Sequence, residues 1–319
     1  MKRITLLLTA ILIAASSNAQ VKPSYIPADT MLLAHIDIKQ LMNSKTGNLI
    51  SESADEITQR KLDSFTAISE IDIKKDFDSL YFVSSDGGEH TGLFYVTGRF
   101  DVEKLTTILG GNEGFSSEPF GSGNILRWED NGEAHYGSFV NNELLVASDD
   151  PARLKKALSL VEGKGEALSP KSPLAKIIPE KNNRFMSFAA YNVDGISKTA
   201  PQLQMLKRAK SVFFSIDQMS ADRADVLLGA AISAADAQTA QQLSSMIQGF
   251  QSMMMMQASQ NPEVARLAQN FKMASKNNTI TMSLKLTEQQ LRKQIADGIK
   301  KQQTWNTSSS NTTMSDEVK

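Results

Sequence analysis

The sequence predicts an α+β protein made of two tandem repeats of a ferredoxin-like unit, each in the order strand–helix–strand–strand–helix–strand with a trailing helix. Three observations support this prediction. Segments of the first half recur in order in the second half, alternating apolar residues predict strands between helices, and capping or turn residues stand at the boundaries. We therefore expect a signal peptide (1–19), a first repeat (20–162), a connector (163–183), a second repeat with an enlarged Met-rich helical pair (184–303) and a disordered tail (304–319).

The internal repeat is carried by four pairs of similar segments. "LAHIDIKQL" (33–41) aligns with "FAAYNVDGI" (188–196), and "SLYFVS" (79–84) aligns with "SVFFSI" (211–216). "GLFYVTGRFDVEKL" (92–105) aligns with "DVLLGAAISAADAQ" (225–238), and "DDPARLKKAL" (149–158) aligns with "LTEQQLRKQI" (286–295). Four matches in the same order indicate that one unit of the chain has been duplicated.

The first repeat is bounded by turn and capping residues. We expect a strand over 31–38, followed by two strands over 80–84 and 93–99 that join across Asp86-Gly87-Gly88. Asp101 has the short acceptor side chain that caps a helix start. A second hairpin turns at Asn141-Asn142, and Asp150-Pro151 begins the last helix of the repeat.

The second repeat ends in a regular pattern. Thr279 to Leu286 alternates strictly between apolar and polar residues, which predicts a strand with one buried face. Thr287 and Gln290 then form a capping box for a final helix. Further up the chain, Ser233 is predicted to cap a long Met-rich helix, and Asn261-Pro262 to begin its shorter partner.

The N-terminus and the composition predict an exported protein. A positive start is followed by an apolar run and by the small residues Ser17 and Ala19, as in a secretory signal peptide that is cleaved before Gln20. No later apolar run reaches the roughly 20 residues of a membrane-spanning helix. With no cysteine, the fold must be held by burial alone. The 34 Lys and Arg nearly balance the 35 Asp and Glu, which argues against nucleic acid as a partner.

One resemblance adds to this. "EIDIKKDFDSLYFV", "GLFYVTGRFDVEKL", a strand hairpin and "DDPARLKKAL" together resemble a layout found in uncharacterised exported proteins of Gram-negative bacteria. The similarity covers most of residues 30–160 and, more loosely, the second repeat. The signal peptide ending in Ala19-Gln20 resembles those of Bacteroidetes. The resemblance implies no activity, ligand or catalytic residue. The signal peptide predicts export to the periplasm, with outer-membrane association or secretion as alternatives.

Few residues point to catalysis. The histidines are His35, His90 and His135, with no spacing typical of a metal site, and no nucleophile elbow or phosphate-binding loop is present. His35 and Asp37 alternate on one strand face and could form a polar pair. We predict no catalytic residue, cofactor or metal. The alternative is a periplasmic hydrolase with a site assembled from scattered residues such as His35, Asp37 and His135.

The four methionines of "QSMMMMQASQ" leave three interpretations open. Met253 and Met254 continue an apolar stripe that includes Leu243 and Phe250, which favours filling of a hydrophobic core. Flexible thioethers also suit an interaction surface for a peptide, lipid or protein, made of Met253, Met254, Met255 and Met256. A Cu(I) site would use Met246, Met253 and Met256, because soft thioethers prefer that ion.

The predicted function is therefore a binding or structural role in the cell envelope, without enzymatic activity. The expected partner is an envelope protein or a peptide that contacts the long helices or the sheets. The first alternative is a hydrolase that would use residues such as His35, Asp37 and His135. The second is Cu(I) binding by Met246, Met253 and Met256.

Overall fold

The computed structural model describes residues 20–54, 56–86, 92–130, 132–178, 183–191, 193, 206 and 208–298. The predicted signal peptide, the turn at Gly87-Gly88, His90 and the predicted disordered tail lie outside these residues. Contacts divide the chain into two compact units. One comprises Met1–Ile38 with Ile71–Ile178, and the other Lys39–Glu70 with Pro179–Lys319.

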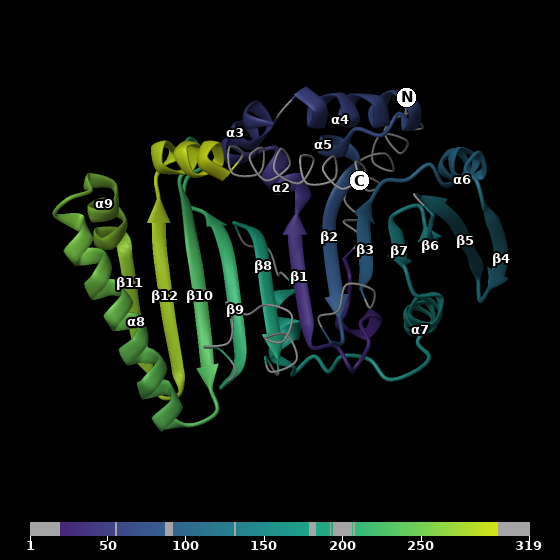
Figure 1. Cartoon of the computed structure of the whole chain (residues 1–319). Helices are drawn as coiled ribbons and strands as arrows, with labels where there is room; N and C mark the ends of the chain where they lie inside the picture. The colour runs from purple at the N-terminus through teal and green to yellow at the C-terminus, as the bar shows by residue number, and fades with distance from the viewer. Residues whose placement is uncertain are drawn as a thin grey trace, which may run out of the picture. The chain divides into compact units, whose positions relative to one another are not determined.

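The first unit contains a seven-stranded antiparallel sheet in the order β1-β2-β3-β7-β6-β5-β4 (Figure 1). Its strands are β1 (Leu32–Asp37), β2 (Phe77–Ser84), β3 (Leu93–Gly98), β4 (Ser116–Phe120), β5 (Gly123–Asp130), β6 (Glu133–Asn141) and β7 (Leu144–Ser148). Its helices are η1 (Pro23–Tyr25), α5 (Ile73–Asp76), α6 (Val102–Gly110), α7 (Pro151–Val161) and η2 (Pro173–Ile177).

The core of the first unit lies on the sheet face that α7 and the two short 3-10 helices cover. Leu33, Val83, Leu93 and Val146 are buried there, because alternate residues of paired strands share one face. Within the predicted connector, η2 contacts β1 and contributes the buried residues Leu174 and Ile177.

The second unit contains a five-stranded antiparallel sheet in the order β8-β9-β10-β12-β11. Its strands are β8 (Arg184–Tyr191), β9 (Ala209–Gln218), β10 (Val226–Ala234), β11 (Phe271–Lys276) and β12 (Thr279–Leu286). Its helices are α2 (Ile38–Met42), α3 (Lys45–Ser53), α4 (Glu56–Ser69), α8 (Ala237–Ala258), α9 (Pro262–Asn270) and a last helix over 288–298. Helix α8 lies along β12 and packs against α9 (Figure 1).

The ferredoxin-like prediction is wrong, although the α+β class is correct. A ferredoxin-like unit needs helices that cross over between parallel strands. Here β1 and β2 are antiparallel neighbours although α2 to α5 separate them in sequence, and β10 and β12 are antiparallel neighbours across α8, α9 and β11. The strands form sheets of seven and five members within the two units, larger than the four-stranded sheet of a ferredoxin-like unit. The internal duplication itself stays a prediction.

Most local boundaries follow the capping and turn residues. The carboxylates of Asp101 and Asp150 accept hydrogen bonds from the backbone amides of Lys104 and Ala152, as expected of helix caps. The Thr287 backbone amide donates to Gln290 Oε1 at 3.0 Å, which is one of the two hydrogen bonds of the predicted capping box.

One predicted boundary is wrong. Ser233 does not cap α8, because it remains in β10 opposite Thr279 of β12. The cap is Asp236, whose carboxylate accepts a hydrogen bond from the Thr239 amide at 2.7 Å. A serine can end a strand as readily as it can begin a helix, and the strand pairing decided between the two roles.

Candidate functional site

His35 and Asp37 occupy the same face of β1, as predicted, but His35 is completely buried at 0% exposure. Its ring centroid lies 4.5 Å from that of Tyr81 on the neighbouring strand, and its Nε2 lies 3.3 Å from Ser79 Oγ. Burial raises the pKa of Tyr81, and the negative charge of Asp37 raises it further. The cluster is a buried polar part of the first unit, and a substrate has no access to the imidazole.

His135 belongs to a different part of that sheet. Its Nδ1 lies 2.7 Å from Asp149 Oδ1, and its ring centroid is 5.8 Å from that of Trp128 on β5. Four strand spacings separate β1 from β6, so the strands that carry His35 and His135 lie roughly 19 Å apart. The structure therefore does not bring together the scattered residues on which a hydrolase site would depend.

The methionine cluster is mostly at the surface. Met253, Met255 and Met256 are each more than half exposed, and Met256 reaches 77%. The core-filling interpretation is wrong for these three residues, because α8 turns only one narrow stripe inward. Met254 alone of the four lies on that stripe, which also carries Leu243 and Ile247.

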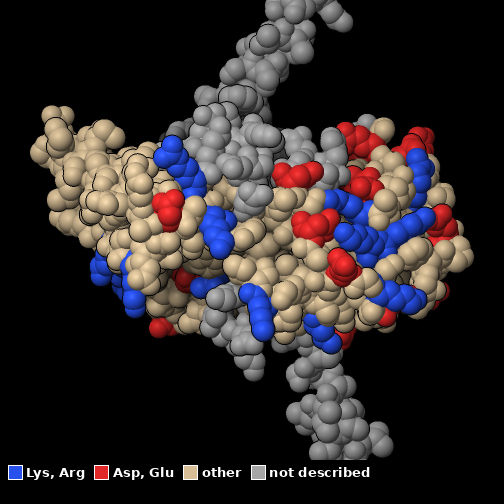
Figure 2. Space-filling model, turned by 90° about the horizontal axis from the view of Figure 1, so that it is seen from below, with Lys and Arg blue, Asp and Glu red and all other residues tan. Residues whose placement is uncertain are grey.

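Helix α8 combines this exposed apolar surface with a complete absence of charge. No Lys, Arg, Asp or Glu occurs between Asp236 and Glu263. Met246, Phe250 and Met253 follow one another at i, i+4 and i+7, and all three are more than half exposed. The surface on the side of α8, at the left of Figure 2, carries few charged side chains. Monomeric proteins rarely expose such a patch without a function.

The residues proposed for Cu(I) lie on this helix. Met246, Met253 and Met256 are exposed, so the structure does not gather them in an enclosed ligand set. Among the described residues, no group of three or more His, Asp or Glu is placed to hold a metal ion. Cu(I) binding by these methionines stays an untested prediction.

Beneath the C-terminal half of α8 lies an apolar cavity of about 250 Å³. Phe250 and Met254 of α8 and Leu267 of α9 form one wall. The other wall is the sheet, with Phe214 of β9, Ala230 of β10 and Met282 of β12. The lining side chains are almost all hydrocarbon or thioether, so a ligand here would be held by burial of apolar surface.

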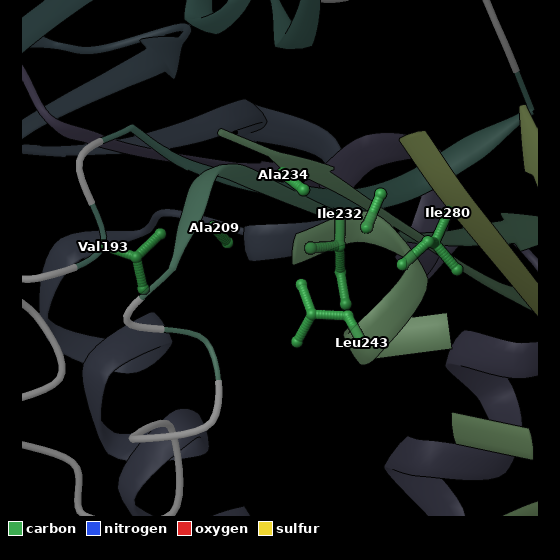
Figure 3. Close-up of a cluster of buried hydrophobic side chains, with 7 residues drawn as sticks. Val193, Ala209, Ile232, Ala234, Leu243 and Ile280 are labelled. Carbon is green, nitrogen blue, oxygen red and sulfur yellow. The ribbon is translucent and has the colours of Figure 1, made fainter. Parts of the chain in front are cut away.

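The cavity lies between two parts of the hydrophobic core of the second unit. On one side, Leu243 of α8 packs with Ile232 of β10 and Ile280 of β12, as Figure 3 shows. On the other side, Val226 of β10 and Leu286 of β12 pack with Phe185 and, more loosely, with Leu267. Side chains pack against one another within each cluster, and the cavity lies between the two clusters. Ala230 contributes to the gap, because it is the small residue between Leu228 and Ile232 on the covered face of β10.

A polar groove of about 160 Å³ lies on the far side of Leu267, which lines both spaces. Its walls come from α9 and the helix over 288–298. Arg266 and Lys293 are its cations, Glu263 is its carboxylate, and three glutamines complete it. Glu263 forms an ion pair with Lys293.

A wider hollow in the first unit, of about 660 Å³, is lined by Asp101, Glu103, Thr106, Thr107 and Asn142 and by Val102. These side chains are mostly exposed and polar, and the hollow is a shallow depression. Specific small-molecule sites are lined mainly by apolar side chains, which favours the cavity under α8.

Sequence reasoning found Met254, Phe250 and Leu267 as apolar helix residues, and Met282 and Leu284 as one face of a strand. It did not place them around a common space. Phe214 and Ala230 were not singled out, and only the alternation in β9 and β10 could have indicated them. The gap itself has no signal in the sequence, since it depends on how far α8 stands from the sheet.

No helix of the described residues is long and apolar enough to cross a membrane. No protein-family model and no curated protein matches the chain. The chain is similar in fold to two crystal structures of TP0453. Crystal form I has 12% sequence identity and a TM-score of 0.51, and the match covers 88% of this chain and 98% of the other. Crystal form IV has 9% identity and a TM-score of 0.52, with 87% and 97% covered. At these identities the likeness shows a shared α+β fold alone.

Proposed function

We propose that this is a non-enzymatic binding protein that acts after export and holds an apolar ligand beneath α8. The observation that carries the proposal is the cavity between α8, α9 and the sheet of the second unit, with its lining of Phe214, Ala230, Phe250, Met254 and Met282. Export is supported by the signal-peptide pattern of residues 1–19.

The size of the cavity limits the ligand. A cavity of 150 Å³ with an apolar lining stays dry and binds benzene. Since a water molecule takes about 30 Å³ in the liquid, 250 Å³ corresponds to about eight groups of that size. An alkyl chain of about eight methylenes, or one substituted aromatic ring, fits this space.

The chemistry of the lining limits the ligand further. Each buried methylene contributes about 0.8 kcal/mol, so eight of them correspond to a dissociation constant of about 10–100 µM before the costs of association. Met254 can adjust to different ligand shapes, because its side chain has three rotatable bonds and a polarisable sulfur. We therefore expect tolerance of related apolar chains with moderate affinity.

The test is direct binding of 1-decanol, measured by isothermal titration calorimetry and by competition with the fluorescent probe N-phenyl-1-naphthylamine. We expect one site per chain, a negative heat-capacity change from apolar burial, and a rise in the melting temperature with ligand concentration. An absence of saturable binding, or binding that shows no heat-capacity change, would overturn the proposal.

A further inference from the structure

The polar groove next to the cavity indicates what kind of apolar molecule is bound. Leu267 lines both spaces, so the cavity and the groove adjoin at this side chain. The groove is also different in character, since its other lining residues are all charged or amides. A ligand that fills both must be an amphiphile with one apolar end and one polar end.

The charges of the groove favour an anionic head. Arg266 and Lys293 provide two positive charges against the single carboxylate of Glu263. Arginine can engage a carboxylate or phosphate with two parallel hydrogen bonds, whereas the glutamines on the helix over 288–298 can donate to either. Because Glu263 already pairs with Lys293, Arg266 is the cation that we expect to contact the head group most directly.

We infer that the ligand is a single-chain amphiphile with an anionic head, its chain in the cavity under α8 and its head at Arg266 and Lys293. This inference rests on the proposed function and names the ligand class for the same site. The shared chemistry of the head is an oxyanion, either a carboxylate or a phosphate.

Binding of matched ten-carbon ligands tests the inference. The ligands are decanoate, decyl phosphate, 1-decanol and decyltrimethylammonium, and inorganic phosphate and acetate serve as heads without a chain. We expect the two anionic amphiphiles to bind about fivefold or more tightly than decanol, and the cationic one to bind more weakly than decanol. The ratio of the dissociation constants of decanoate and decyl phosphate shows whether the site prefers a carboxylate or a phosphate. The heads alone should not bind measurably.

Two substitutions in the groove sharpen the test. Arg266→Gln should weaken decanoate binding about fivefold and leave decanol binding unchanged. Glu263→Gln should strengthen decanoate binding, because it removes the carboxylate that occupies Lys293. Lys272→Gln is the matched control. It removes an exposed cation next to Phe271, on the opposite face of β11 from the cavity, and should change neither affinity.

The possible failures are separable. If decanoate and decanol bind with equal affinity, and Arg266→Gln changes neither affinity, the inference of an anionic head group is wrong. The proposed apolar site would still stand. If inorganic phosphate binds saturably and as tightly as decyl phosphate, the alkyl chain contributes nothing, and the inference of an amphiphilic ligand is wrong. A failure of all chain-bearing ligands to bind would overturn the proposed function and this inference together.

Discussion

Ala230 of β10 lies directly opposite Met282 of β12, and both line the cavity beneath α8. On its other side Ala230 faces Phe214 of β9. Because Ala230 is small and lies between the larger Phe214 and Met282, it leaves room at the floor of the cavity.

Ala230→Leu should fill the cavity and abolish binding of decanol. The melting temperature should stay the same or rise, because filling a cavity commonly adds about 0.5–2 kcal/mol. Calorimetry with decanol and thermal unfolding measure the two effects. The control is Thr281→Leu, an exposed position on β12 whose side chain points to the opposite face from Met282. If Ala230→Leu binds decanol as well as the unmodified protein, the ligand does not occupy this space.

Met254 and Met256 should respond differently to the same change. Met254→Leu preserves volume and should cost less than about 1.5 kcal/mol of unfolding free energy. Met254→Asp should cost about 1–3 kcal/mol and abolish ligand binding, because it places a charge against an apolar lining.

Met256→Asp is the comparison, since Met256 is exposed at the surface of α8. We expect it to change stability by less than about 0.5 kcal/mol and to leave decanol binding intact. Denaturant titration of each variant measures these free energies. A large loss of stability with Met256→Asp would show that this side chain is covered in solution.

The contribution of Asp236, the N-cap residue of α8, to the stability of the folded state should depend on pH. The hydrogen bond from the Thr239 backbone amide lowers the pKa of Asp236 below its ordinary value of 3.8. A carboxyl group whose pKa is lowered by folding stabilises the folded state above its unfolded pKa, and this stabilisation is lost as the pH falls through the folded pKa. The loss from this group is therefore expected below pH 3.8.

Asp236→Asn isolates this effect. Asparagine keeps an oxygen that can cap the helix but does not titrate. The difference in melting temperature between the unmodified protein and the variant should shrink as the pH is lowered from 7 to 3. A difference that is constant over this range would show that Asp236 does not titrate differently in the folded and unfolded states.

His35→Ala should destabilise the first unit without affecting any activity. Removing a fully buried ring that lies 4.5 Å from the Tyr81 ring should cost about 3 kcal/mol, as do other truncations of buried rings. A broad hydrolase screen on the protein and the variant provides the functional readout. Turnover that His35→Ala abolishes, at a temperature where the variant is still folded, would contradict the non-enzymatic proposal.

The sequence by itself determined most of the local structure, because local signals act over a few residues. Asp101, Asp150 and Asn261 begin their helices where their short acceptor side chains predict. The alternation of Thr279 to Leu286 places Ile280, Met282 and Leu284 on the face that α8 covers. The chain turns at Asn142-Glu143 between β6 and β7, one residue later than the expected Asn141-Asn142, because Asn141 still pairs with Leu144.

Only the tertiary structure decided which strands are neighbours and where the apolar residues leave a gap. A strand with one apolar face can pair with several partners, so the same element order fits a ferredoxin-like unit and the antiparallel sheets that are present. Ser233 has the chemistry of a helix cap, but it pairs with Thr279 of β12 inside β10, which ends at Ala234, and the helix cap is Asp236. The apolar stripe of α8 predicted burial for Phe250 and Met253, and both are more than half exposed, because the sheet covers only the line from Leu243 through Ile247 to Met254. The cavity arises from the spacing between helix and sheet, which depends on packing between residues that are far apart in the sequence.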